Sequence, residues 1–147
     1  MKLFGLRKRF YIPPIICILI MYILAGISPL IDVKHVYKVC PAFIIYTDVY
    51  LDSGSCGAAR GIIVLINPKS RDDQTVIDHE LIHIQQSYRS LFTDWIFCWL
   101  DKEHLAKREC EAYAIQINNV DNIPIWAKMI QEEYSPNAPL ENIEEYL

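Results

Sequence analysis

The chain has 147 residues, a length typical of one compact domain and too short for two full cores. Hydrophobic residues make up 52% and charged residues 22% of the sequence, which excludes disordered, collagen-like and low-complexity proteins. The net charge of -4 arises from 14 Lys+Arg against 18 Asp+Glu, so the chain offers no strongly basic surface for a phosphate backbone. We therefore expect no nucleic acid partner.

An uncharged apolar run extends from residue 10 to residue 31. As a helix that rises about 1.5 Å per residue, it would be long enough to cross a hydrocarbon core of about 30 Å. Lys2 and the basic residues 7–9 precede it, so the positive-inside rule places the N-terminus in the cytoplasm and the rest on the exported side, periplasmic or extracellular. Residues 1–31 are thus predicted to form a basic stub and a single-pass transmembrane anchor. A cleaved signal peptide is the alternative, although no A-x-A cleavage pattern is present.

The rest of the chain is predicted to be one domain, residues 32–135, followed by a C-terminal tail, residues 136–147, because no repeat or linker divides it. β-Branched and aromatic residues at 42–51 and 61–68 favour short strands joined by a turn, as a small antiparallel pair or a meander. Hydrophobic periodicity then predicts helices at about 74–88, 91–100 and 102–118, and a short one after Pro124. Strands followed by helices indicate an α+β fold. For the apolar segment 91–100 a core helix is favoured over a surface that dips into a membrane.

Five cysteines leave the pairing of thiols open. Cys17 lies inside the apolar run and would have no partner there. The other four either form two disulfides, for which sequence proximity favours Cys40 with Cys56 and Cys98 with Cys110, or remain separate buried thiols.

Residues 79–83 read HELIH and carry the strongest chemical signal in the sequence. His79 and His83 are four residues apart, so on a helix they stand on the same face and can bind one metal ion together. Glu80 follows the first histidine, where its carboxylate can reach a water on that metal rather than the metal itself. The motif therefore predicts a catalytic metal centre, and histidines satisfied within a core without metal are the alternative.

A catalytic zinc ion needs three protein ligands, with a fourth position left to water. After His83 the chain reads IQQSYRS, which excludes the HxxGxxH extension of the metzincins. The third ligand must come from another element, and the predicted helix that contains KRECEAYAIQ supplies Glu109 and Glu111. These two side chains lie about 200° apart around a helix, so they cannot both face the metal.

HELIH followed on a later helix by E-C-E-A-Y resembles the small gluzincin-type zinc metallopeptidases, over about residues 60–115. The resemblance implies a small zincin-like domain with one zinc ion bound by His79, His83 and a glutamate of the second helix. The first glutamate of that pattern corresponds to Glu109, which we favour, and Glu111 remains the alternative. Tyr113 stands where the family pattern has Asp or Asn.

The resemblance and the chemistry of the motif imply the same reaction, the hydrolysis of a peptide or protein substrate by a zinc-activated water, with Glu80 as the base. Together with the predicted anchor, this makes a membrane-anchored zinc peptidase the leading hypothesis. The strand at residues 61–66 is expected to align an extended substrate by edge pairing, as in similar peptidases. One alternative is a noncatalytic envelope or phage-type membrane protein that keeps the metal as a structural clamp and acts by binding partners. Another is a protease-like fold that needs a partner for activation.

Five further side chains are weaker candidates. Tyr113 and Tyr88 could donate a hydrogen bond to an oxyanion, although a core or surface role is the simpler interpretation. His104 could act as a donor, but its charged neighbours favour a solvated helix face. Gln86 is read as a packing or ligand-supporting residue, and Asp78 could orient an imidazole but is expected to be exposed.

Overall fold

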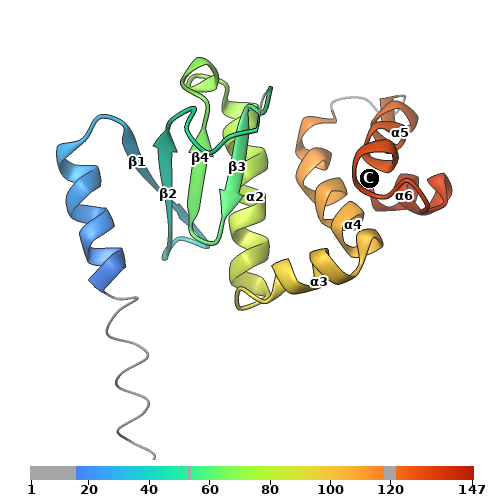
Figure 1. Cartoon of the computed structure of the whole chain (residues 1–147), viewed down its shortest axis with the longest axis horizontal. Coiled ribbons are helices and arrows are strands. Elements are labelled where there is room, and N and C mark those ends of the chain that lie inside the picture. The colour runs from blue at the N-terminus through green and yellow to red at the C-terminus, as the bar shows by residue number, and fades with distance from the viewer. Residues whose placement is uncertain (1–15, 53, 118–121) are drawn as a thin grey trace, which may run out of the picture.

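The computed structural model of the protein describes residues 16–52, 54–117 and 122–147. In chain order, four strands precede helices α2 to α6 (Figure 1). A short 3-10 helix, η1, lies between β4 and α2, and a second one, η2, lies between α4 and α5. The bounds of these elements are β1 Ile31–Val36, β2 Cys40–Tyr46, β3 Gly57–Arg60, β4 Ile63–Ile66, η1 Pro68–Ser70, α2 Gln74–Arg89, α3 Asp94–Leu100, α4 Lys102–Tyr113, η2 Ala114–Gln116, α5 Ile123–Tyr134 and α6 Leu140–Tyr146. An additional helix covers residues 16–27 ahead of β1.

The four strands form one mixed sheet in the order β1-β2-β4-β3. β1 pairs with β2 and β3 pairs with β4 in antiparallel fashion, whereas β2 and β4 run parallel. The predicted antiparallel pairing of the strands near 42–51 and 61–68 is therefore wrong. The reason is β3, which forms inside the stretch that was expected to be a turn. The tight β3–β4 hairpin reverses the chain once more, and Gly61 at its tip adopts a φ of 67°.

Two hydrophobic clusters hold the fold together. In the first, Ile44 and Tyr46 of β2 and Val64 and Ile66 of β4 pack on α2, because alternate strand residues point to the same face of the sheet. The second cluster joins α4, α5 and α6 around side chains that include Ala106, Cys110, Ala127, Ile130 and Ile143. The segment expected to be a C-terminal tail thus contains α6, whose Ile143 is only 1% exposed.

The prediction of an N-terminal transmembrane helix is corrected for the residues that the structure describes. The described helical residues 16–27 span about 18 Å, well short of a bilayer core of about 30 Å. The chain then turns at residues 28–30 and enters β1, so the end of the apolar run belongs to the sheet. Within the described ranges, no helix combines the length and the apolar character needed to cross a membrane. The basic residues 2–9 and the start of the run, residues 10–15, lie outside the described residues.

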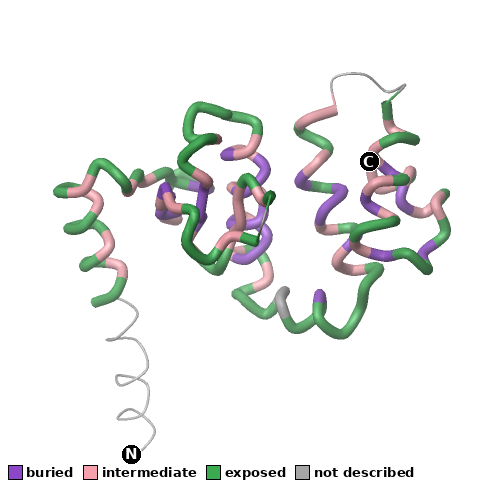
Figure 2. The backbone as a smooth tube through the Cα atoms, turned by 45° about the horizontal axis from the view of Figure 1, so that its top comes forward, coloured by how far each residue is buried: buried purple, intermediate pink, exposed green. Residues whose placement is uncertain are grey.

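All five cysteines are free, which agrees with the alternative of separate thiols, and neither proposed disulfide forms. Of the four thiols expected to be buried in that case, Cys98 and Cys110 are buried, whereas Cys56 is exposed and Cys40 is half-buried. Helix α3 is not a core helix: Phe97, Trp99 and Leu100 are 52%, 76% and 67% exposed, while Cys98 is buried. The helical residues 16–27 likewise include no buried residue, as their green and pink colouring in Figure 2 shows.

Candidate metal centre

Helix α2 carries the HELIH motif on the side that faces α4. Its first turn is capped by the Asp73 carboxylate, which accepts hydrogen bonds from the backbone N–H groups of Thr75 and Val76 at 3.1 and 3.4 Å. One turn of helix separates His79 from His83, and the Nε2 atoms of the two rings lie 3.2 Å apart. The residues are only 8% and 6% exposed, so both imidazoles are held in a buried position.

Helix α4 brings Glu109 to the two imidazoles. Its Oε2 atom lies 3.7 Å from Nε2 of His79 and 3.5 Å from Nε2 of His83, and the residue is 8% exposed. Glu111 points elsewhere: Arg89 binds it through two nitrogens at 3.0 and 2.7 Å. This ion pair holds the pKa of Glu111 below its usual range. Of the two glutamates, Glu109 is therefore the one that lies with the histidines.

The three ligand atoms fit a single divalent ion. Ligands at about 2.1 Å from a tetrahedral zinc ion lie about 3.4 Å from one another, close to the 3.2, 3.5 and 3.7 Å found between these atoms. Two imidazoles and a carboxylate are also a donor set that zinc favours. His79, His83 and Glu109 thus form a buried group that could hold a metal ion.

Charge is concentrated at this group. Burial alone would raise the pKa of Glu109, but the neighbouring imidazoles of His79 and His83 lower it to about 2. Burial likewise favours the neutral form of His83, yet Glu109 outweighs it and raises the pKa of that histidine. The Glu109 carboxylate therefore favours a positive charge beside the two Nε2 atoms. A protonated imidazole or a bound cation could supply that charge.

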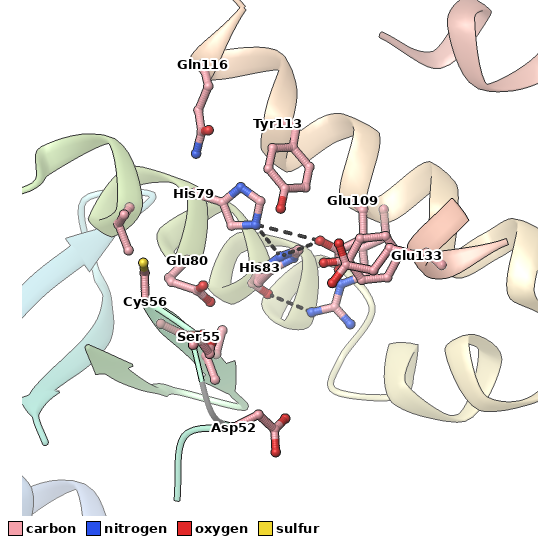
Figure 3. A pocket seen from close by; sticks show the side chains of 17 residues that line it. Asp52, Ser55, Cys56, His79, Glu80, His83, Glu109, Tyr113, Gln116 and Glu133 are labelled. Atoms are coloured by element: carbon pink, nitrogen blue, oxygen red, sulfur yellow. Dashed lines mark hydrogen bonds and ion pairs between the residues drawn. The ribbon is translucent and has the colours of Figure 1, made fainter. Parts of the chain in front are cut away.

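The ring of His79 is oriented by packing. The Tyr113 ring lies against it with the centroids 4.4 Å apart and the planes at 64°. In the described part of the chain, Nδ1 of His79 is a buried nitrogen without a hydrogen-bond partner. Figure 3 shows the Tyr113 hydroxyl pointing into the space beside His79 and Glu109, and the amide of Gln116 pointing toward the His79 ring.

Glu80 turns toward strand β3. Its carboxylate accepts a hydrogen bond from the backbone N–H of Ala59 and is 7% exposed. Burial raises the pKa of Glu80, and the two nearby histidines offset this only in part. Figure 3 shows this carboxylate at the cavity, on the β3 side of the histidines. The group is thus a buried, oriented carboxylate with an enhanced affinity for a proton.

Gly57 of β3 makes room for Glu80. A Cβ atom at Gly57 would lie 3.0 Å from both Cγ and Oε1 of Glu80, and 3.1 Å from Cδ1 of Ile66. Contacts this short are uncommon between packed side chains, so an added methyl group requires its neighbours to shift by a few tenths of an ångström. We expect Gly57→Ala to lower the free energy of unfolding by about 1–3 kcal/mol in the wild type, measured by urea denaturation.

A double-mutant cycle identifies the cause of that loss. In a Glu80→Ala background the same Gly57→Ala change is expected to cost clearly less, because the larger clash is gone. An Ile66→Val background is the matched control, since it removes only the Cδ1 contact. An equal cost of Gly57→Ala with and without Glu80 would show that the glycine does not serve this side chain.

The candidate ligands open onto a cavity of about 810 Å³ between β3, α2, α4 and α5. Asp52 lies at one rim, on the loop before β3, and Glu133 of α5 lies near Glu109 on the other side (Figure 3). The cavity has the size of a site for a small ligand or a short peptide segment. The point where His79, His83 and Glu109 meet is thus both buried between helices and open to this cavity.

Of the five weaker candidates, two lie at the site and three do not. Tyr88 donates to the carbonyl of Pro41 at 2.8 Å, and Asp78 accepts from Gln74 at 2.6 Å, so neither serves the histidines. His104 packs on the Phe97 ring at 5.8 Å between centroids. Tyr113 lines the cavity, and Gln86 contacts His83 directly.

Sequence reasoning missed β3 and with it Gly57 and the Ala59 N–H. The stretch DSGSCGAAR reads as a turn because glycine and serine dominate it. Its glycines were the available signal, because a glycine in a strand often marks a close approach of another group. Arg108, which lies beside Gln86, was also missed.

Comparison of the chain with protein-family models, with curated proteins and with solved structures finds no match in any of the three.

Proposed function

We propose that this protein is a zinc-dependent peptidase whose ion is held by His79, His83 and Glu109. The observation that carries the proposal is the meeting of these three ligand atoms within 3.2 to 3.7 Å of one another, at the wall of a large cavity and beside Glu80. A closed structural site would place a fourth protein ligand there. Among the described residues, the group that could hold a metal ion comprises only these three.

In this proposal Glu80 and Tyr113 have separate roles in the hydrolysis. Zinc bound at this position would polarise a peptide carbonyl and acidify a water. Glu80 takes the proton of the attacking water at its carboxylate and delivers it to the leaving amine. The Tyr113 hydroxyl, which points into the same space, is placed to donate a hydrogen bond to the carbonyl oxygen as it gains charge.

Strand β3 supplies a place to align an extended substrate. The expectation that residues 61–66 would do this is corrected, because β4 lies between β2 and β3 and has no open edge. The backbone N–H of Asn67 donates to the carbonyl of Cys56, so these two residues form a hydrogen-bonded pair at the end of the β3–β4 ladder. In an antiparallel ladder every second residue bonds to the partner strand, so the N–H and C=O groups of Gly57 and Ala59 point away from β4. Glu80 accepts the N–H of Ala59, and the Ser55 hydroxyl donates to the carbonyl of Gly57 at 2.7 Å. The N–H of Gly57 and the carbonyl of Ala59 are therefore left as pairing groups.

The proposal is tested with a mixture of unstructured peptides. We expect the zinc-loaded protein to cleave some of them, a chelator to abolish cleavage, and added zinc to restore it, with products identified by mass spectrometry. Cleavage that persists undiminished after the metal is removed, or a zinc-loaded protein that cleaves nothing, would contradict the proposed function.

A further inference from the structure

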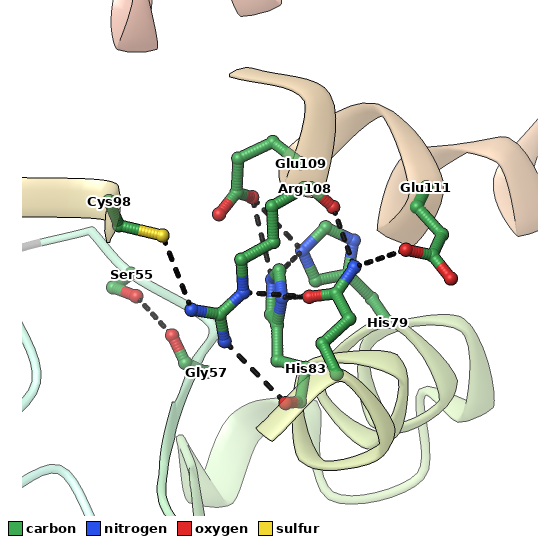
Figure 4. A network of polar contacts seen from close by, with 9 residues as sticks. Ser55, Gly57, His79, His83, Cys98, Arg108, Glu109 and Glu111 are labelled. Atoms are coloured by element: carbon green, nitrogen blue, oxygen red, sulfur yellow. Dashed lines mark hydrogen bonds and ion pairs between the residues drawn. The ribbon is translucent and has the colours of Figure 1, made fainter. Parts of the chain in front are cut away.

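Gln86 of α2 joins a network of polar contacts that links α2 to α4 and includes His83, Arg108 and Glu111. Figure 4 shows these three partners and the contacts between the two helices. Gln86 follows His83 by three residues on α2 and is only 3% exposed. Its Oε1 atom lies 2.9 Å from Nδ1 of His83 and accepts a hydrogen bond from Nε of Arg108 at 2.7 Å. Its Nε2 atom donates to the backbone carbonyl of Arg108 at 3.0 Å and to Oε2 of Glu111 at 2.9 Å. Both atoms of the amide thus use their full hydrogen-bonding capacity.

Two of these partners have fixed roles, and they determine which way the amide faces. The Arg108 guanidinium can only donate, so it must meet the amide oxygen. The Glu111 carboxylate is ionised in its ion pair with Arg89 and can only accept, so it must meet the amide nitrogen. The amide oxygen of Gln86 therefore faces His83, and a flipped amide would break both contacts.

The orientation of the amide decides the protonation of the imidazole. An amide oxygen only accepts, so Nδ1 of His83 must carry a hydrogen. In the neutral ring Nε2 then bears the lone pair, and this atom lies 3.5 Å from Glu109 and 3.2 Å from Nε2 of His79. We infer that Gln86 is a positioning residue that holds His83 in the tautomer able to bind a cation through Nε2.

The same network positions the third ligand. Arg108 directly precedes Glu109 on α4, and it meets Gln86 through both its side chain and its backbone carbonyl. Arg108 also reaches the carbonyl of His83 at 3.5 Å and the Cys98 sulfur at 3.6 Å. These contacts fix α4 against α2 at the level where the carboxylate and the imidazoles meet, so Gln86 serves ligands on both helices.

The tautomer can be measured directly in the metal-free protein. The inference rests on the metal site of the proposed function, but its test needs no hydrolysis. Long-range proton–nitrogen NMR correlations distinguish Nδ1–H from Nε2–H in a neutral imidazole, and the His83 signals are identified by their absence in His83→Ala. Because Glu109 raises the pKa of His83, the spectra are recorded at a pH high enough for the ring to be neutral, and there we expect wild-type His83 to carry its hydrogen on Nδ1. A wild-type ring protonated on Nε2 alone would overturn the inference without any variant.

Three variants then test the role of the amide. Gln86→Leu is expected to release His83 to the other tautomer and to weaken zinc binding by about 10- to 100-fold. Gln86→Glu keeps an acceptor toward His83 and Arg108 and should retain the wild-type tautomer. Gln85→Leu, the same change at the neighbouring position, is the matched control and should alter neither property. If Gln86→Leu behaves like Gln85→Leu in both measurements, the inference fails.

The results also separate this inference from the proposed function. A protein that cleaves no peptide, but shows the Nδ1–H tautomer and the zinc loss in Gln86→Leu, would contradict the peptidase and support the role of Gln86. An active zinc peptidase whose metal-free His83 carries its hydrogen on Nε2 would do the reverse.

Discussion

Glu80→Gln is expected to hydrolyse peptides about 100- to 10,000-fold more slowly than the wild type, because it removes the group that accepts the proton of water. The substituted amide keeps the shape of the side chain, and its oxygen can still accept the hydrogen bond from the Ala59 N–H. The loss should therefore appear in kcat, with zinc affinity close to that of the wild type. Steady-state kinetics and a zinc titration of the same preparation measure both quantities.

Glu133→Gln is the matched control for this experiment. It removes the same charge from the same cavity, but at an exposed position on α5. We expect it to change kcat by no more than a few fold. Unchanged hydrolysis by zinc-loaded Glu80→Gln would show that another group is the base, whatever the control does.

Removal of a ligand is the second large effect. His83→Ala and Glu109→Ala are each expected to weaken zinc binding by more than about 100-fold, because even changes to groups that only support a ligand cost about 10- to 100-fold. The affinity can be measured by competition with a chromophoric chelator. Circular dichroism of the metal-free variants checks that the fold is retained.

Glu111→Ala and His104→Ala provide the controls. Glu111 lies on the same helix as Glu109 but pairs with Arg89, and His104 packs on Phe97 away from the site. We expect His104→Ala to bind zinc like the wild type and Glu111→Ala to lose less than about 10-fold, through its contact with Gln86. A large loss in Glu111→Ala with none in Glu109→Ala would mean that the third ligand is misassigned.

Local signals in the sequence were sufficient to predict the helix that carries the HELIH motif. The apolar periodicity predicted a helix over about residues 74–88, and α2 covers Gln74–Arg89. Helical geometry alone places His79 above His83 and separates Glu109 from Glu111. These features follow from spacing within one helix, so they can be deduced without knowledge of the tertiary structure.

The features that the sequence did not predict depend on contacts between distant segments. β2 and β4 run parallel because β3 forms between them in the chain, and β3, with the sequence GAAR, lacks the β-branched and aromatic residues typical of strands. The apolar run at residues 10–31 could not be assigned from hydropathy alone, because its last residue is the first of β1. The Gln86 network likewise joins residues 22 and 25 positions apart, which no local pattern reveals.

The coordination of zinc in the wild-type protein tests the central claim most directly. X-ray absorption at the zinc edge, on protein loaded with one equivalent, should show two imidazoles and two oxygen ligands at about 2.0–2.2 Å, one oxygen from Glu109 and one from water. A spectrum that requires sulfur ligands or a single imidazole would contradict the site formed by His79, His83 and Glu109.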